Sequence, residues 1–201
     1  MAAADLLSLT ETASYLGIAQ KTKTDTEIQT FITATSLRVD EICGPNVIRT
    51  VTNEAHDGGA TVIKLDHAPV STFTTVTEYS GTTATVLTAE SNSSQPANSY
   101  LWDTRTELLY RRANGGDWFF PAGRRNIVLT YQAGRVADTA SVTSQFKEAA
   151  LIIVAHLWRT ERGAGTMTFG EDGGLVPGFG FAIPRRAMEL LADQVRGPVI
   201  V

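Results

Sequence analysis

The sequence predicts an α+β protein: a small α-helical bundle with an antiparallel β insertion between the second and third long helices. Three observations favour this class. Residues 142–162 hold the longest apolar concentration of the chain, at the three- and four-residue spacings of a helix. Two capped helical patterns precede it, and between them and 142–162 the apolar period changes to two. The predicted organisation is N-terminal helices over 1–45, a β-rich insertion over 46–136, and helices with a tail over 137–201 that complete the bundle.

Two capping patterns define the N-terminal helices. Ser8 stands three residues before Glu11, which is the spacing of a capping box, and Thr10 is an alternative cap. Gly17 ends the short helix that follows. A second box at 24–27 begins a longer helix, which ends before Pro45 because proline disfavours helical conformation in the residue before it. We therefore expect one short and one long helix ahead of the β insertion.

The middle of the chain has the patterns of strands and turns. Residues 47–54 and 61–66 flank an Asp-Gly-Gly turn, and 73–79 and 83–88 flank a Ser-Gly turn, so two hairpins are predicted. Threonine is abundant here, which suits an antiparallel sheet with one face in solvent. Further strands are expected at 101–102, 107–112 and 126–132.

A glycine-rich segment separates the third long helix from the last one. Residues 163–181 contain seven of the chain's 17 glycines, and loops of this length are usually functional or ordered only on binding. The segment carries four large apolar side chains, which predict contact with a neighbouring molecule: Met167, Phe169, Phe179 and Phe181. A last helix is predicted from Pro184 through Val195, before an apolar tail at 199–201. The tail has two interpretations: packing on its own last helix, or docking on a partner, where it could add a strand.

Composition limits the classes of function. A net charge of -4 argues against a protein whose main task is to grip duplex DNA, because that affinity comes mostly from Lys and Arg. Cys43 is the single cysteine, so no internal disulfide can form. The opening residues lack the basic segment and apolar run of a secretory signal, and the 142–162 helix is too short to span a membrane. We expect synthesis in a reducing cytoplasm and no membrane partner.

The usual catalytic and cofactor motifs are missing from the sequence. It contains no Gly-x-Ser-x-Gly, no Walker loop, no His-Glu-x-x-His and no cysteine pair for a metal. His156 lies in the apolar helix without an evident partner, so a helix-surface histidine explains it better than a general base. His56 and His67 lie at the edges of predicted hairpins and carry less weight. We expect a protein that is not an enzyme and has no cofactor or metal site.

Arginines and aromatic residues are interleaved in the second half of the β insertion. This pattern can form a platform for single-stranded nucleic acid, or a contact between subunits, where both residue types are enriched. The acidic total charge favours the subunit contact. The residues concerned are Arg111, Arg112, Trp118, Phe119, Phe120, Arg124 and Arg125.

The serial order of these patterns resembles a known family. The chain opens with LLSLTETASYLGI, continues with TDTEIQTFITATSLRVDEICG, closes its β insertion with IVLTYQAG, and then has FKEAALIIVAHLWRTER and IPRRAMELLADQVRG. This is similar to the head–tail connector, or adaptor, family of long-tailed bacteriophages. The motifs are packing patterns without a catalytic signature, and their order over most of the chain carries the resemblance.

The resemblance implies a structural protein of the virion neck. Such a protein assembles as a homo-oligomeric ring, typically of twelve copies, beneath the portal protein. It extends the channel through which duplex DNA passes without specific recognition, and it joins the capsid to a stopper or head-completion protein and the tail. A ring requires heterologous contacts, in which one patch meets a different patch on the neighbour.

The resemblance also implies a portal-docking segment at the C-terminal end. The residues that correspond to it here are Arg185, Arg186, Arg196, Gly197, Pro198, Val199, Ile200 and Val201. Two other classes stay open: a nucleic-acid-binding module that uses the arginine and aromatic residues, and another tail-associated structural protein.

Overall fold

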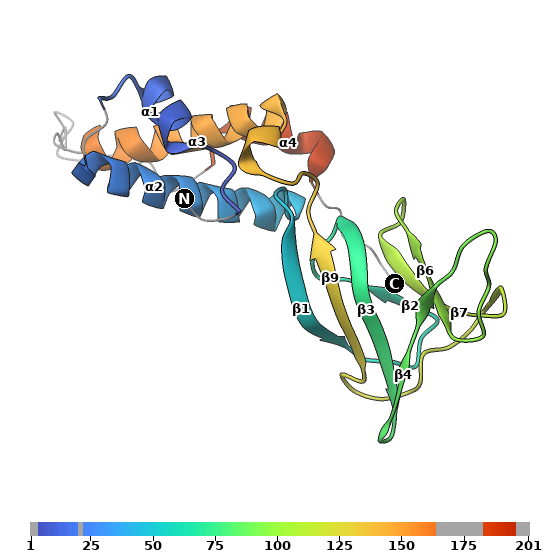
Figure 1. Ribbon diagram of the computed structural model, residues 1–201. Coiled ribbons are helices and arrows are strands. Elements are labelled where there is room, and N and C mark those ends of the chain that lie inside the picture. Colours follow the sequence, from blue (N-terminus) through green and yellow to red (C-terminus); the bar gives the residue numbers. More distant parts are fainter. Residues whose placement is uncertain (1–3, 20–21, 164–182, 196–201) are drawn as a thin grey trace, which may run out of the picture. The chain divides into compact units, whose positions relative to one another are not determined.

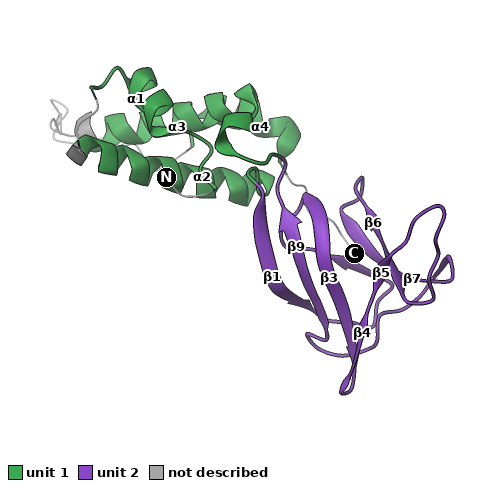
Figure 2. Cartoon of the chain, in the orientation of Figure 1, with its two compact units in different colours: residues 1–47, 136–197 green, residues 48–135, 198–201 purple. Residues whose placement is uncertain are grey.

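The computed structural model describes residues 4–19, 22–163 and 183–195 (Figure 1). The described chain is a mixed α+β protein and forms two compact units (Figure 2). The helical unit falls within residues 1–47 and 136–197, and the β unit within 48–135. No helix in the described part of the chain has the length and apolarity that a bilayer crossing requires.

Four α-helices form the described part of the helical unit. They are α1 (Leu9–Leu16), α2 (Thr22–Cys43), α3 (Ser144–Gly163) and α4 (Arg185–Leu191), with 3-10 turns at Thr139–Ser141 and Ala192–Gln194. Both predicted boundaries of α1 are confirmed: the Glu11 amide donates to Ser8 Oγ at 3.2 Å, and Gly17 adopts the left-handed conformation with φ 67°. The last helix is shorter than predicted, because Val195 is already extended, with ψ 126°.

The core of the helical unit lies between α2 and α3. The stripe predicted on the 142–162 helix is buried, including Ala149, Ala150 and Ile153, and it packs with Ile28 and Ile32 of α2. Apolar residues at helical spacing thus bury one face of each helix against the other, which is the main stabilising contribution to such a pair.

Two sheets form the β unit. The first has the strand order β1 (Arg49–His56), β9 (Ile127–Ala133), β3 (Val70–Ser80) and β4 (Thr83–Val86). The second has β2 (Val62–Lys64), β7 (Leu108–Ala113), β6 (Ser99–Asp103) and β5 (Thr88–Ala89), with β8 (Gly116–Asp117) paired to β7. Pairing is antiparallel except between β5 and β6. One core contains residues of both sheets, among them Leu109, Leu129 and Tyr131.

The two predicted hairpins had different outcomes. The β3–β4 hairpin is confirmed, with Ser80 opposite Thr83. The hairpin predicted around the Asp-Gly-Gly sequence is wrong, because β1 pairs with β9 and β2 pairs with β7. A side chain on Gly58 would place Cβ 2.0 Å from the Pro121 carbonyl oxygen, and the Gly58 amide donates to the Gly123 carbonyl at 3.0 Å. Glycine is therefore required for a close approach to a distant loop as the chain passes between the sheets.

Candidate functional sites

The predicted arginine and aromatic region divides into buried and exposed residues. Arg111 is 3% exposed and Phe120 is 1% exposed, so both side chains belong to the interior of the β unit. As a correction to the sequence analysis, these two offer no surface to a neighbour. Trp118 and Phe119 are 58% and 64% exposed, and the prediction that they contact another molecule stays open.

Arg111 connects the two sheets through an internal ion pair. Its Nε and Nη2 atoms donate to the two carboxylate oxygens of Glu78 on β3, each at 2.8 Å. The same guanidinium donates to the Ser99 carbonyl and to Asn98 Oδ1, both at 3.2 Å. A buried charge is tolerated when it is paired and hydrogen-bonded in this way, so Arg111 has a structural role.

Arg112 has a similar role nearer the surface. Its Nε donates to Glu90 at 3.0 Å, and the other guanidinium nitrogens donate to Asp117 and to the Gly115 carbonyl. The hydrogen bonds that Arg112 donates to Glu90 and then to Asp117 raise the pKa of Arg112 above its ordinary value. This network holds the short β8 strand on β7, immediately before the exposed Trp118.

The loop at 118–126 presents exposed residues on a fixed backbone. The Asn126 side chain donates to the Pro121 carbonyl at 2.7 Å and accepts from the Gly58 amide at 2.9 Å. Arg124 and Arg125 are exposed, and the Arg125 amide donates to Asp57 Oδ1 at 2.7 Å. An exposed aromatic pair and two arginines therefore share one ordered loop.

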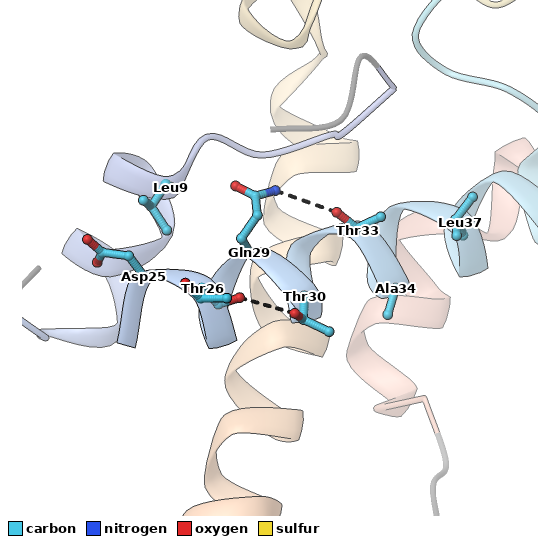
Figure 3. Close-up of a pocket in the computed structure, with 8 residues that line it drawn as sticks. All are labelled: Leu9, Asp25, Thr26, Gln29, Thr30, Thr33, Ala34 and Leu37. Carbon is cyan, nitrogen blue, oxygen red and sulfur yellow. Dashed lines mark hydrogen bonds between the residues drawn. The ribbon is translucent and has the colours of Figure 1, made fainter. Parts of the chain in front are cut away.

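An open groove of about 750 Å³ runs along α2 in the helical unit (Figure 3). Thr30 Oγ1 donates to the Thr26 carbonyl at 3.1 Å, which satisfies this hydroxyl within the helix. Leu9, Ala34 and the exposed side chain of Leu37 give the groove an apolar part among its polar residues. The lining residues are Leu9, Asp25, Thr26, Gln29, Thr30, Thr33, Ala34 and Leu37. A helix face of this kind suits a protein partner.

A third feature is a cluster of titratable groups around Glu54 in the β unit. His56 Nε2 lies 2.7 Å from Glu54 Oε1, and His67 Nδ1 lies 2.9 Å from Oε2. The Tyr131 hydroxyl donates to Oε2 at 2.6 Å, and the Asp66 amide donates to Oε1 at 3.0 Å. The carboxylate of Glu54 is 6% exposed and has a close polar partner on each side.

These contacts shift two pKa values. Burial raises the pKa of Glu54, but the hydrogen bonds from His56, Tyr131, His67 and the Asp66 amide outweigh it and lower the pKa to about 2. Burial, together with the Glu54 carboxylate, raises the pKa of the Tyr131 hydroxyl above its ordinary value. Glu54 is therefore ionised and Tyr131 protonated across the physiological pH range.

Sequence reasoning missed the Glu54 cluster. In the sequence His56 and His67 carry little weight, because each lies at the edge of a predicted hairpin. The available signal was a Glu-x-His pattern at 54–56 and an Asp-His pair at 66–67, at the two ends of the segment between β1 and β3. Recognising the cluster from this signal requires knowing that residues 54–56 and 66–67 lie close together in the folded chain.

The remaining predicted site residues are placed only in part. Arg185 and Arg186 are exposed on α4, where Arg185 Nε lies 3.2 Å from Glu189 Oε1. The other predicted docking and contact residues lie outside the described residues; they are Met167, Phe169, Phe179, Phe181, Arg196, Gly197, Pro198, Val199, Ile200 and Val201.

Solved structures share the fold over nearly the whole chain. A chain from a structure described as "Neck of empty GTA particle computed with C6 symmetry" is 15% identical, with a TM-score of 0.58, and the match covers 97% of this chain and 92% of that one. A chain from "Virion of native gene transfer agent (GTA) particle" is 16% identical, with a TM-score of 0.56 and the same coverage. No protein-family model matches this chain, and neither does any curated protein. The likeness at these identities is one of fold.

Proposed function

We propose that this chain is a structural protein of the neck of a phage-like particle, acting as a head–tail adaptor. The observation that carries the proposal is the fold shared over 97% of the chain with a chain from the neck of a GTA particle. The serial order of the sequence motifs, which resembles that of the adaptor family, also supports it. An adaptor works by being held between neighbours and needs no reaction centre.

The adaptor forms a homo-oligomeric ring, of twelve copies, beneath the portal protein. The α2 groove and the exposed Trp118–Phe119 pair support such assembly, since a cyclic ring joins two different patches of each copy. The C-terminal segment, with Arg185 and Arg186 on α4, docks on the portal, and the opposite side receives a stopper or head-completion protein and the tail. Duplex DNA passes through the ring without sequence-specific contacts, which a net charge of -4 permits.

Removal of the tail tests the docking role. A chain lacking residues 197–201 is expected to remain folded, because residues between 6 and 191 form both described cores. It should fail to bind portal-bearing heads in a pull-down that retains the full-length chain. Equal retention of both chains would refute the docking role and leave the fold assignment untouched.

A nucleic-acid-binding module is the second candidate function. The observation that favours it is the loop at 118–126, where exposed Trp118 and Phe119 share an ordered backbone with Arg124 and Arg125. Stacking and phosphate contacts would make binding of a labelled oligonucleotide steeply salt-dependent, and alanine at both arginines would abolish it. The adaptor proposal predicts no such salt-dependent binding.

A further inference from the structure

Two of the chain's three histidines meet at one carboxylate in the β unit. Glu54 and His56 come from β1, whereas Asp66 and His67 follow β2. One side of the Glu54 carboxylate, Oε1, faces His56 Nε2 at 2.7 Å and the Asp66 amide at 3.0 Å. The other side, Oε2, is held by His67 and Tyr131.

A β-bulge explains why Glu54 points to this place. Val51 lies opposite Tyr131 and Glu54 lies opposite Leu129, so three steps along β1 match two along β9. The extra residue is accommodated at Asn53, whose φ is 55°. Without the bulge, alternation would direct Glu54 away from the face of Tyr131 and Leu129. The irregularity thus places a carboxylate where an apolar side chain is expected, as bulges beside functional sites do.

Glu54, His56 and Asp66 bring three potential metal ligands close together. One ligand atom each from Glu54, His56 and Asp66 can be chosen so that all three lie within 4.8 Å of one another. Ligand distances of about 2.0–2.2 Å separate neighbouring ligand atoms by about 3.4 Å in the tetrahedral geometry of Zn²⁺, and by about 3 Å in an octahedral site, where opposite ligand atoms lie about 4.2 Å apart. The 2.7 Å separation of Glu54 Oε1 and His56 Nε2 therefore needs to open by about 0.3 Å for an octahedral ion and about 0.7 Å for a tetrahedral one.

We propose that Glu54, His56 and Asp66 bind a divalent first-row transition-metal ion such as Zn²⁺ or Mn²⁺. One imidazole with two carboxylates suits these ions better than Ca²⁺ or Mg²⁺, which prefer oxygen ligands alone. The ion takes the place of the hydrogen-bonded proton between His56 Nε2 and Glu54 Oε1. His56 Nε2 then binds the ion, and the imidazole carries its proton on Nδ1.

The other neighbours of Glu54 support the site without binding the ion. His67 and the Tyr131 hydroxyl hold Oε2 at 2.9 and 2.6 Å, which fixes the orientation of the carboxylate, as outer hydrogen-bond partners of metal ligands commonly do. The bound ion joins β1 of one sheet to the segment that follows β2 of the other. Its role is to fasten the β unit, and this inference does not depend on the adaptor assignment.

The test uses the full chain after treatment with a chelator. Titration with Zn²⁺ and with Mn²⁺, followed by calorimetry and thermal unfolding, should show one ion bound per chain and a higher midpoint temperature with at least one of them. Co²⁺ substitution should give visible absorption bands that report coordination by the His56 nitrogen.

Three variants distinguish a built site from an adventitious one. His56→Gln and Asp66→Asn should each weaken metal binding by about a hundredfold or more, and His67→Gln by about tenfold, as expected for an outer partner. The matched control is His156→Gln, which removes the one histidine outside the cluster and should bind as the unaltered chain does. The proposal is overturned if neither ion binds at stoichiometric level, or if His56→Gln binds as tightly as His156→Gln, which would indicate adventitious binding only.

Discussion

The internal ion pair of Arg111 and Glu78 offers a sharp test of the β unit's construction. In Glu78→Gln, the Arg111 guanidinium stays buried but loses the compensating charge, while its weaker bonds to Ser99 and Asn98 remain. The two side chains are 4% and 8% exposed, so water cannot replace the lost partner. Breaking a buried pair from one side costs about 3–5 kcal/mol, and we expect Glu78→Gln to lie near the lower end because the amide still accepts one hydrogen bond.

The double variant Glu78→Leu/Arg111→Met separates the pair's own contribution from the penalty of an orphaned charge. Removing both charges leaves no buried ion, so it should cost less than either single change. Arg124→Gln is the control, because it also removes one charge from the β unit but at an exposed position, and it should change stability by less than about 0.5 kcal/mol.

Urea unfolding by tryptophan fluorescence measures these differences. A Trp158→Phe background removes the tryptophan of the helical unit, so that the fluorescence comes from Trp102 and Trp118 of the β unit. With a slope of about 2 kcal/mol per M, a loss of 3 kcal/mol lowers the midpoint by about 1.5 M. A midpoint shift for Glu78→Gln no larger than that of the control would refute the assignment of a stabilising buried pair.

Three further predictions concern other parts of the chain. Replacing Trp118 and Phe119 by serine should leave stability within about 0.5 kcal/mol but weaken assembly into particles, as measured by incorporation; normal incorporation would count against the contact role. Gly58→Ala should lower the free energy of unfolding by about 2 kcal/mol or more, because the added Cβ would lie 2.0 Å from the Pro121 carbonyl oxygen. Gly116→Ala is the control: its Cβ would lie 3.6 Å from the nearest atom, so thermal unfolding should be nearly unchanged. In chelator, the lowered pKa of Glu54, about 2 against 4.5, contributes about 3 kcal/mol of stability that is present above pH 4.5 and is lost as pH falls toward 2; an equal pH dependence in Glu54→Gln would contradict this.

Local signals explain what the sequence predicted correctly. Ser8 begins α1 and Gly17 ends it, through hydrogen bonds to residues only a few positions away. The apolar spacing of α3 is likewise a property of that segment alone. The β3–β4 hairpin also needs only its own turn. Such features can be recognised without knowledge of the rest of the chain.

Long-range contacts explain what the sequence could not predict. An Asp-Gly-Gly sequence usually makes a turn, but here Gly58 is required by the approach of Pro121 from a distant loop. Arg111 is buried because Glu78 lies across the core, 33 residues away in sequence. Glu54 meets His67 only because a bulge at Asn53 redirects it. None of these partners is specified by local periodicity.

A three-dimensional reconstruction of the particle neck would test the adaptor proposal most directly. We predict a closed ring of this chain between the portal and the tail, with the α2 face or the 118–126 loop of each copy against its neighbour. The account is contradicted if the chain is present in mature particles as an isolated monomer, or if it occupies a position away from the neck.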